Sequence, residues 1–261
     1  MRVAPVSSKG SGQPPAPRRT ARWLGFIAAV LLIVVTPVIG LGAQAVVSPP
    51  PEVERSDDPA VIDARRRIES GDLQGAVVLL QDVLQEDDGS DIHRKARRLG
   101  TLGVALSQAG AAAEAIQVQH QALALYESLA DPAGISAVTL NLGNSLSQVG
   151  DNAAALRHFE AALALKRQHG IERGVGAIYN NIAELVEADG DLDQAQHAFE
   201  QALAAYAREQ NANGESLARA NLARVLAQRG EFEPAQAQIQ AAESLARAND
   251  SHRALRSTLA A

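Results

Sequence analysis

Five glycines at a nearly constant spacing constrain this chain more than any other feature. They stand at Gly71, Gly110, Gly150, Gly190 and Gly230, so the steps between them are 39, 40, 40 and 40 residues. An alanine follows five residues after each of these glycines. A period of this length indicates a structural repeat, in which each unit buries its apolar face by stacking on its neighbours.

Each repeat has the pattern of two helices joined at the glycine. Leu142 and Gly143 stand just before Gly150, and Ala155 and Phe159 follow at helical spacing; the other repeats show the same kinds of residue. A glycine between two apolar-periodic segments supplies the left-handed residue that ends a helix. Aromatic residues make up only 3% of the chain, which argues against a β-sandwich or barrel.

The pattern predicts five antiparallel helix pairs. The first helices are expected near 59–70, 91–109, 131–149, 171–189 and 211–229. The second helices are expected near 72–86, 112–130, 152–169, 192–210 and 232–248. A last segment, Ser251 to Leu259, is expected to cap the open end of the array, because terminal repeats need a covering face.

From Pro59 to about Asn249 the chain resembles the tetratricopeptide repeat family. The period of 40 residues is longer than the common 34, and no proline closes the repeats. In this respect the chain is similar to kinesin light chain-like adaptors and bacterial regulatory members of the family. The resemblance implies an all-α, right-handed α-solenoid over residues 59–261, whose first helices line a concave groove that binds extended peptides.

Candidate groove residues are polar positions on the predicted first helices. Asn141, Asn181 and Asn221 occupy one register in three successive repeats, and Thr101 takes that place in the repeat before. The resemblance implies that an asparagine here bonds to the ligand backbone. A side-chain amide donates and accepts at once, whereas asparagine is unfavourable inside a helix. These facts favour a peptide-binding ladder; the alternative is a set of duplicated surface residues.

The predicted groove comprises further polar neighbours of that ladder. The site residues are Asn141, Asn144, Asn180, Asn181, Glu184, Asn221, Arg224 and Arg97, with Gly100, Gln148 and Gln228 beside them. Arg97 belongs to the basic run Arg94 to Arg98, for which two interpretations stand. The run is either a solvated helix start balanced by nearby acids or a contact for an acidic partner.

The segment 23–47 is apolar apart from Thr36 and Gln44. As a helix it would be roughly 37 Å long, enough to cross a hydrocarbon core of about 30 Å. It is expected to be a signal anchor that stays in the membrane, or a signal peptide cleaved near Ala45 after the small-x-small sequence Ala43-Gln44-Ala45. Its length favours the anchor. Residues 1–22 are expected to be a disordered basic tail, and 48–58 a proline-rich acidic linker.

Charge gives the expected orientation. The first 45 residues carry five basic groups and no acidic one, and acidic residues follow the apolar segment. The positive-inside rule therefore predicts a cytoplasmic N-terminus and periplasmic or extracytoplasmic repeats at the inner membrane. The remainder carries 19 basic and 30 acidic groups, which argues against a nucleic-acid partner. The absence of cysteine excludes disulfides and thiol catalysis.

The sequence shows no nucleophile beside a base and no HExxH metal motif. It therefore predicts no enzyme, no cofactor, no metal site and no small-molecule substrate. The leading hypothesis is a noncatalytic scaffold, membrane-anchored or exported, that binds an extended peptide or partner protein in the concave groove. The alternatives are a regulatory or sensor module, or a subunit of an envelope assembly complex.

Overall fold

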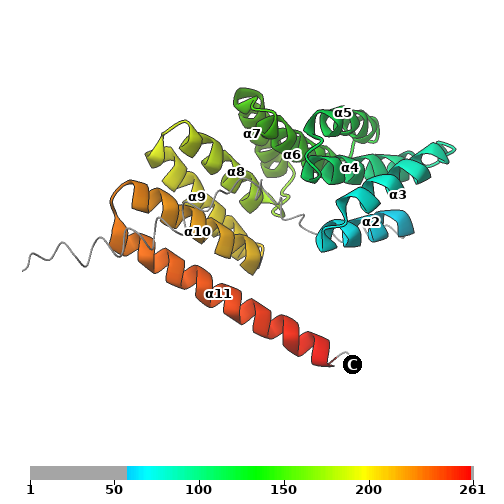
Figure 1. Ribbon diagram of the computed structural model, residues 1–261. Coiled ribbons are helices and arrows are strands. Elements are labelled where there is room, and N and C mark those ends of the chain that lie inside the picture. The colour runs from blue at the N-terminus through cyan, green and yellow to red at the C-terminus, as the bar shows by residue number, and fades with distance from the viewer. Residues whose placement is uncertain (1–57, 260–261) are drawn as a thin grey trace, which may run out of the picture. The chain divides into compact units, whose positions relative to one another are not determined.

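The computed structural model describes residues 58–259, and within this range every element is a helix (Figure 1). The helices are α2 (Pro59–Ser70), α3 (Leu73–Gln85), α4 (Ile92–Gln108), α5 (Ala112–Ser128), α6 (Pro132–Gln148), α7 (Asn152–Gln168), α8 (Val175–Ala188), α9 (Leu192–Arg208), α10 (Ala212–Gln228) and α11 (Phe232–Leu259). Even-numbered helices are the first and odd-numbered helices the second of each pair. The predicted all-α array of helix pairs is confirmed for these residues.

No helix between residues 58 and 259 is both long and apolar enough to span a bilayer. The predicted membrane segment 23–47 lies outside the described residues, as do the tail 1–22 and the linker before Asp58.

The repeating glycines end the first helices as predicted. All five have φ between +81° and +86°, in the left-handed region. At Gly150 the backbone N–H bonds to the Ser147 carbonyl, and the N–H of Asp151 bonds to the Leu146 carbonyl. The Asp151 carboxylate then accepts the Ala154 N–H at 3.0 Å. The Gly-Asp pair thus caps one helix and starts the next.

Small residues set the distance between the helices of a pair. The alanines five residues after the repeating glycines are all buried. A Cβ atom at Gly143 would lie 2.4 Å from Cε1 of Phe159, so α6 and α7 approach more closely than a larger residue would permit. Phe159 and Phe199 are fully buried, and each such side chain contributes about 1.5–3 kcal/mol of burial free energy.

The stacking of the pairs separates the two kinds of helix. Each first helix contacts the next one, in the order α2, α4, α6, α8 and α10. The second helices of the described chain share no comparable contact. Each packs instead on the first helix of its own pair, and those from α3 to α9 also pack on the next first helix. Because the first helices lie nearer one another, they form the concave side of the array.

The start of α8 differs from the prediction. It was expected at residue 171, but the helix begins at Val175 because Gly170 and Gly174 both have positive φ. Glu209, from the end of α9, accepts the N–H groups of Gly174 at 3.1 Å and Gly176 at 2.8 Å. A carboxylate from the neighbouring second helix therefore replaces the missing side-chain cap.

The end of the array also differs. The last second helix was expected to end near residue 248, but α11 continues without a break to Leu259, so residues 251–259 extend that helix. Their capping of the open end stays a prediction. After Pro234, in the first turn of the helix, the sequence has no glycine or proline that would interrupt it.

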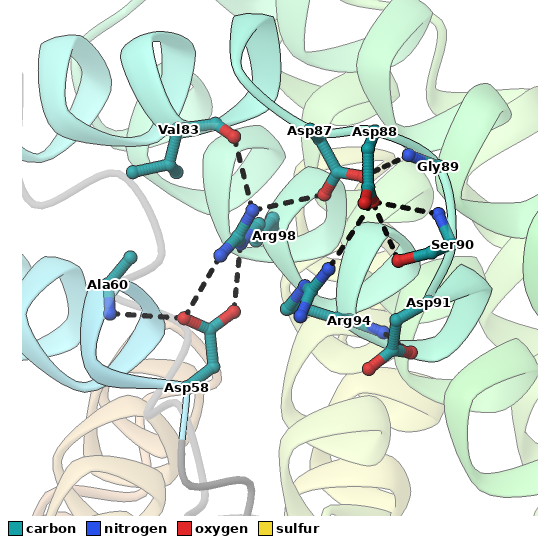
Figure 2. Close-up of polar contacts among 10 residues, drawn as sticks. All are labelled: Asp58, Ala60, Val83, Asp87, Asp88, Gly89, Ser90, Asp91, Arg94 and Arg98. Atoms are coloured by element: carbon teal, nitrogen blue, oxygen red, sulfur yellow. Dashed lines mark hydrogen bonds and ion pairs between the residues drawn. The ribbon is translucent and has the colours of Figure 1, made fainter.

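The basic run at the start of α4 holds the first repeat together, as Figure 2 shows. Arg98 Nε pairs with Asp58 Oδ2 at 2.8 Å, and Nη1 pairs with Asp87 Oδ2 at 3.0 Å. Nη1 also donates to the Val83 carbonyl at 3.1 Å. Arg94 lies 3.8 Å from Asp88. The run is balanced by nearby acids, as the first interpretation held.

Arg98 itself is not solvated, contrary to that interpretation. Its side chain is 14% exposed, and those of Asp58 and Asp87 are 2% and 0% exposed. The next two repeats place the apolar Val138 and Ile178 at the position of Arg98. The ion pairs therefore stand where other repeats have a hydrophobic contact, and they fix Asp58, the first described residue, to α4.

Replacing Arg98 with Ala removes the cation that two buried carboxylates share. We expect the free energy of unfolding of the full-length protein to fall by about 3–5 kcal/mol, because uncompensated buried charges are costly. Urea denaturation measures the change. Arg66→Ala is the control, because its pair with Asp63 is exposed at the surface and its loss should have little effect. Equal effects of the two substitutions would contradict a stabilising role for Arg98.

Candidate functional site

Polar side chains of the first helices bond across each junction from α4 to α10. We call these residues the polar seam: Ser107, Asn144, Gln148, Asn180, Asn181, Glu184, Glu187, Asn221, Arg224 and Gln228. Ser107 Oγ donates to Gln148 Oε1 at 3.2 Å and joins α4 to α6. Asn181 Nδ2 donates to Asn144 Oδ1 at 2.6 Å and joins α6 to α8. The seam thus follows the concave side of the array.

The junction between α8 and α10 has the densest part of the polar seam. Asn221 Nδ2 donates to Asn180 Oδ1 at 3.2 Å and to Glu184 Oε1 at 3.1 Å. The same Glu184 oxygen accepts from Asn180 Nδ2 at 2.8 Å. One carboxylate oxygen is therefore held by amides from two helices, which fixes the orientation of the Glu184 side chain.

Charge at this junction is unbalanced. Glu187 is paired with Arg224, and its Oε1 also accepts from Gln228 Nε2 at 2.9 Å. Burial raises the pKa of Glu187 above its ordinary value, and Arg224 opposes this shift. Burial also raises the pKa of Glu184, opposed by the hydrogen bond from Asn180 and by the charge of Arg224. Two partly desolvated carboxylates therefore lie near one guanidinium, which pairs with Glu187.

The three ladder asparagines are not equivalent. The half-buried Asn141 makes no side-chain hydrogen bond to a described residue. Asn181 is 7% exposed and uses one N–H for Asn144, which leaves its second N–H and its carbonyl oxygen. Asn221 uses its amino group twice and accepts from Arg224 Nη2 at 3.4 Å. Asn141 is thus the most available of the three, and ligand binding by this ladder stays a prediction.

Thr101 does not extend the ladder into α4. Its hydroxyl donates to the Arg97 carbonyl one turn earlier in the same helix, at 2.9 Å. Arg97 is half-buried and has no ion pair with a described residue, and its Nε has no hydrogen-bond partner there. Its predicted contact with an acidic partner stays a prediction.

The structure brings most of the predicted groove residues together. Those within the polar seam are Asn144, Asn180, Asn181, Glu184, Asn221 and Arg224. Asn141 lies on α6 and Arg97 on α4, but neither side chain forms a hydrogen bond to a residue of the polar seam. Ser107 and Glu187 belong to the polar seam but were not predicted from the sequence. Glu187 follows Glu184 by three residues on α8, a spacing that places both on one helical face and could have identified it.

Over residues 58–259, no three or more His, Cys, Asp or Glu side chains gather as the ligands of a metal ion would.

Several solved structures share this architecture. BtubC (BKLC) from P. vanneervenii is 21% identical with a TM-score of 0.61, over 88% of this chain and 90% of that one. The Rap conjugation gene regulator of plasmid pLS20, solved with the Phr* peptide, is 20% identical with a TM-score of 0.66, over 74% of this chain and 54% of that one. A kinesin light chain repeat protein of Podosopora anserina is 19% identical with a TM-score of 0.57, over 74% of this chain and 95% of that one. At these identities the likeness shows a common fold.

No curated protein resembles the chain closely enough to count as a match. A sequence model described as Tetratricopeptide repeat matches residues 134–208 and 174–248. A second model with the same description matches residues 96–132, so together the two cover more than half of the chain. With the helix pairs and their glycine turns, these matches show that the chain belongs to the tetratricopeptide repeat family.

Proposed function

We propose that this protein is a noncatalytic interaction scaffold that binds an extended peptide segment of a partner protein along its first helices. The observation that carries the proposal is the set of amides on the concave side whose hydrogen-bonding capacity is unused. Asn141 offers its whole amide, and Asn181 offers one N–H and its carbonyl oxygen. An amide can pair with a peptide unit whatever side chains the ligand carries.

Two structural neighbours support a peptide or protein ligand. The Rap regulator of plasmid pLS20 was solved in complex with the Phr* peptide. Another Rap protein, 18% identical with a TM-score of 0.66, was solved in complex with Competence and Sporulation Factor. A fold of helix pairs thus accommodates such ligands in those proteins, and the same capacity is proposed for this chain.

The saturation of the polar seam limits where the ligand backbone binds. The amino group of Asn221 donates to two residues of α8, and its carbonyl oxygen accepts from Arg224 of α10. A ligand must therefore compete with these hydrogen bonds. At α6 no such competition exists for Asn141. The ligand backbone is therefore proposed to bond first at α6 and α8, and to reach α10 through side-chain contacts.

We further propose that residues 23–47 hold the protein at the inner membrane as a single-pass anchor, with the N-terminus cytoplasmic and the repeats extracytoplasmic. The apolar length of the segment and the basic residues before it support this proposal. Cleavage near Ala45 would instead release the repeats as an exported protein.

Asn141→Ala tests the proposed groove. We expect recovery of the partner in affinity purification from membranes to fall, and affinity for the partner to weaken about tenfold, because two hydrogen bonds of about 0.5–1.5 kcal/mol each are lost. Thermal stability should not fall, because the Asn141 side chain bonds to no described residue.

Asn152→Ala is the matched control, because it makes the same change on the second helix α7 and should leave recovery unchanged. A triple replacement of Asn141, Asn181 and Asn221 by Ala extends the test once its stability has been measured. Unchanged recovery with both Asn141→Ala and the triple variant would refute the groove.

The intact mass of the protein extracted from membranes tests the anchor. A retained anchor predicts that residues 1–22 are present and that the protein stays in the membrane fraction after a carbonate wash. A mature N-terminus near Val46, with the protein in the soluble fraction, would contradict the anchor and support export.

A further inference from the structure

Glu184 is the residue of the polar seam whose side chain retains a hydrogen-bond acceptor for a charged ligand. Its Oε1 is held by Asn180 and Asn221, at 2.8 and 3.1 Å. Its Oε2 receives no hydrogen bond from a described residue, and it is not among the buried unpaired atoms of the structure. The carboxylate is therefore oriented by two helices, while its second oxygen is not fully buried and accepts no hydrogen bond from a described residue.

Glu187 adds negative charge beside it that is not fully compensated. Its side chain is 5% exposed, and its Oε2 has no hydrogen-bond partner in the described chain. Arg224 pairs with Glu187 Oε1 and also donates a hydrogen bond to Asn221 Oδ1, so its guanidinium forms no direct ion pair with Glu184. The cluster keeps one uncompensated negative charge in a site where little water screens it.

The fold does not require these acids. At the position of Glu184 the neighbouring repeats have Val104, Asn144 and Arg224, and the first helices that carry these residues also contact a neighbouring first helix. At the position of Glu187 they have Ser107, Ser147 and Ala227. Other repeats have neutral or basic residues at these two positions, and burial disfavours the charged form of both acids. Their presence is therefore better explained by the binding of a ligand than by a contribution to stability.

We propose that Glu184 binds the ammonium or guanidinium group of a lysine or arginine side chain in the peptide ligand, with Glu187 supplying further negative charge behind it. This inference rests on the proposed peptide-binding function and specifies the ligand's chemistry. The cation approaches Oε2 of Glu184, forms a charge-assisted hydrogen bond and neutralises the excess charge of the cluster. Backbone contacts at Asn141 and Asn181 place that side chain against α8.

The experiment is selection of a random peptide library displayed on phage against the full-length protein in detergent. Wild type is expected to enrich peptides with lysine or arginine at one fixed position. Glu184→Gln keeps the Oε1 acceptor for Asn180 and Asn221 but removes the charge. It should bind the best selected peptide about tenfold more weakly, the loss of one charge-assisted bond. Glu160→Gln, an exposed change on α7, should bind it as wild type does.

A double-mutant cycle completes the test. Replacing the selected basic residue of the peptide by alanine should weaken binding to wild type by the same factor and leave binding to Glu184→Gln unchanged. Enrichment of peptides without a basic residue, or Glu184→Gln affinity within twofold of wild type, would overturn the inference. If those peptides still depend on Asn141, the proposed function survives. If no peptide is enriched at all, both fall.

Discussion

The close approach of two helices at each glycine turn is the constraint on which the other features of this protein depend. Alanine at one register, and Gly143 opposite Phe159, bring first and second helices together. A helix pair cannot bury both of its faces, so pairs must stack, and stacking puts the first helices in contact with one another. Polar side chains on those helices then lie within reach of the next repeat, and this proximity creates the polar seam.

The hydrogen bonds of the polar seam determine which amides on the concave side remain available to a ligand. A ladder of free amides would bind any extended peptide in the same way at each repeat. Instead the availability of the amides falls from Asn141 through Asn181 to Asn221, while negative charge accumulates around Glu184. Under the proposed function the face would be graded, with the ligand backbone bound at α6 and its side chains selected at α8 and α10. Such grading would give a ligand one preferred direction and one preferred register.

Periodicity was sufficient to predict most of the fold. The glycines, the alanines and the apolar residues between them report on local helix caps and on contacts within a pair, which repeat with the sequence. The exceptions are contacts between distant residues. Arg98 looked like a surface residue, because only the fold brings Asp58 and Asp87 to it. The start of α8 is likewise held by Glu209, from the end of another helix. The length of α11 is a different case, because the absence of a glycine or proline after Pro234 is a local feature of the sequence.

The candidate site was predictable as a set of residues but not as a network. Register placed the asparagines on one face, whereas the bonds from Asn181 to Asn144 and from Asn221 to Glu184 join residues 37 positions apart. Those bonds decide which amide is free, and no local pattern encodes them.

Site-specific photocrosslinking in intact membranes tests most directly whether the first helices bind the partner. A photoreactive residue at the exposed Ala137, one turn before Asn141 on α6, should crosslink to one discrete partner and map to one short segment of it. The same residue at Glu160, exposed on α7, should give no such product. A partner captured equally from Glu160, or captured only there, would show that binding does not use the concave side.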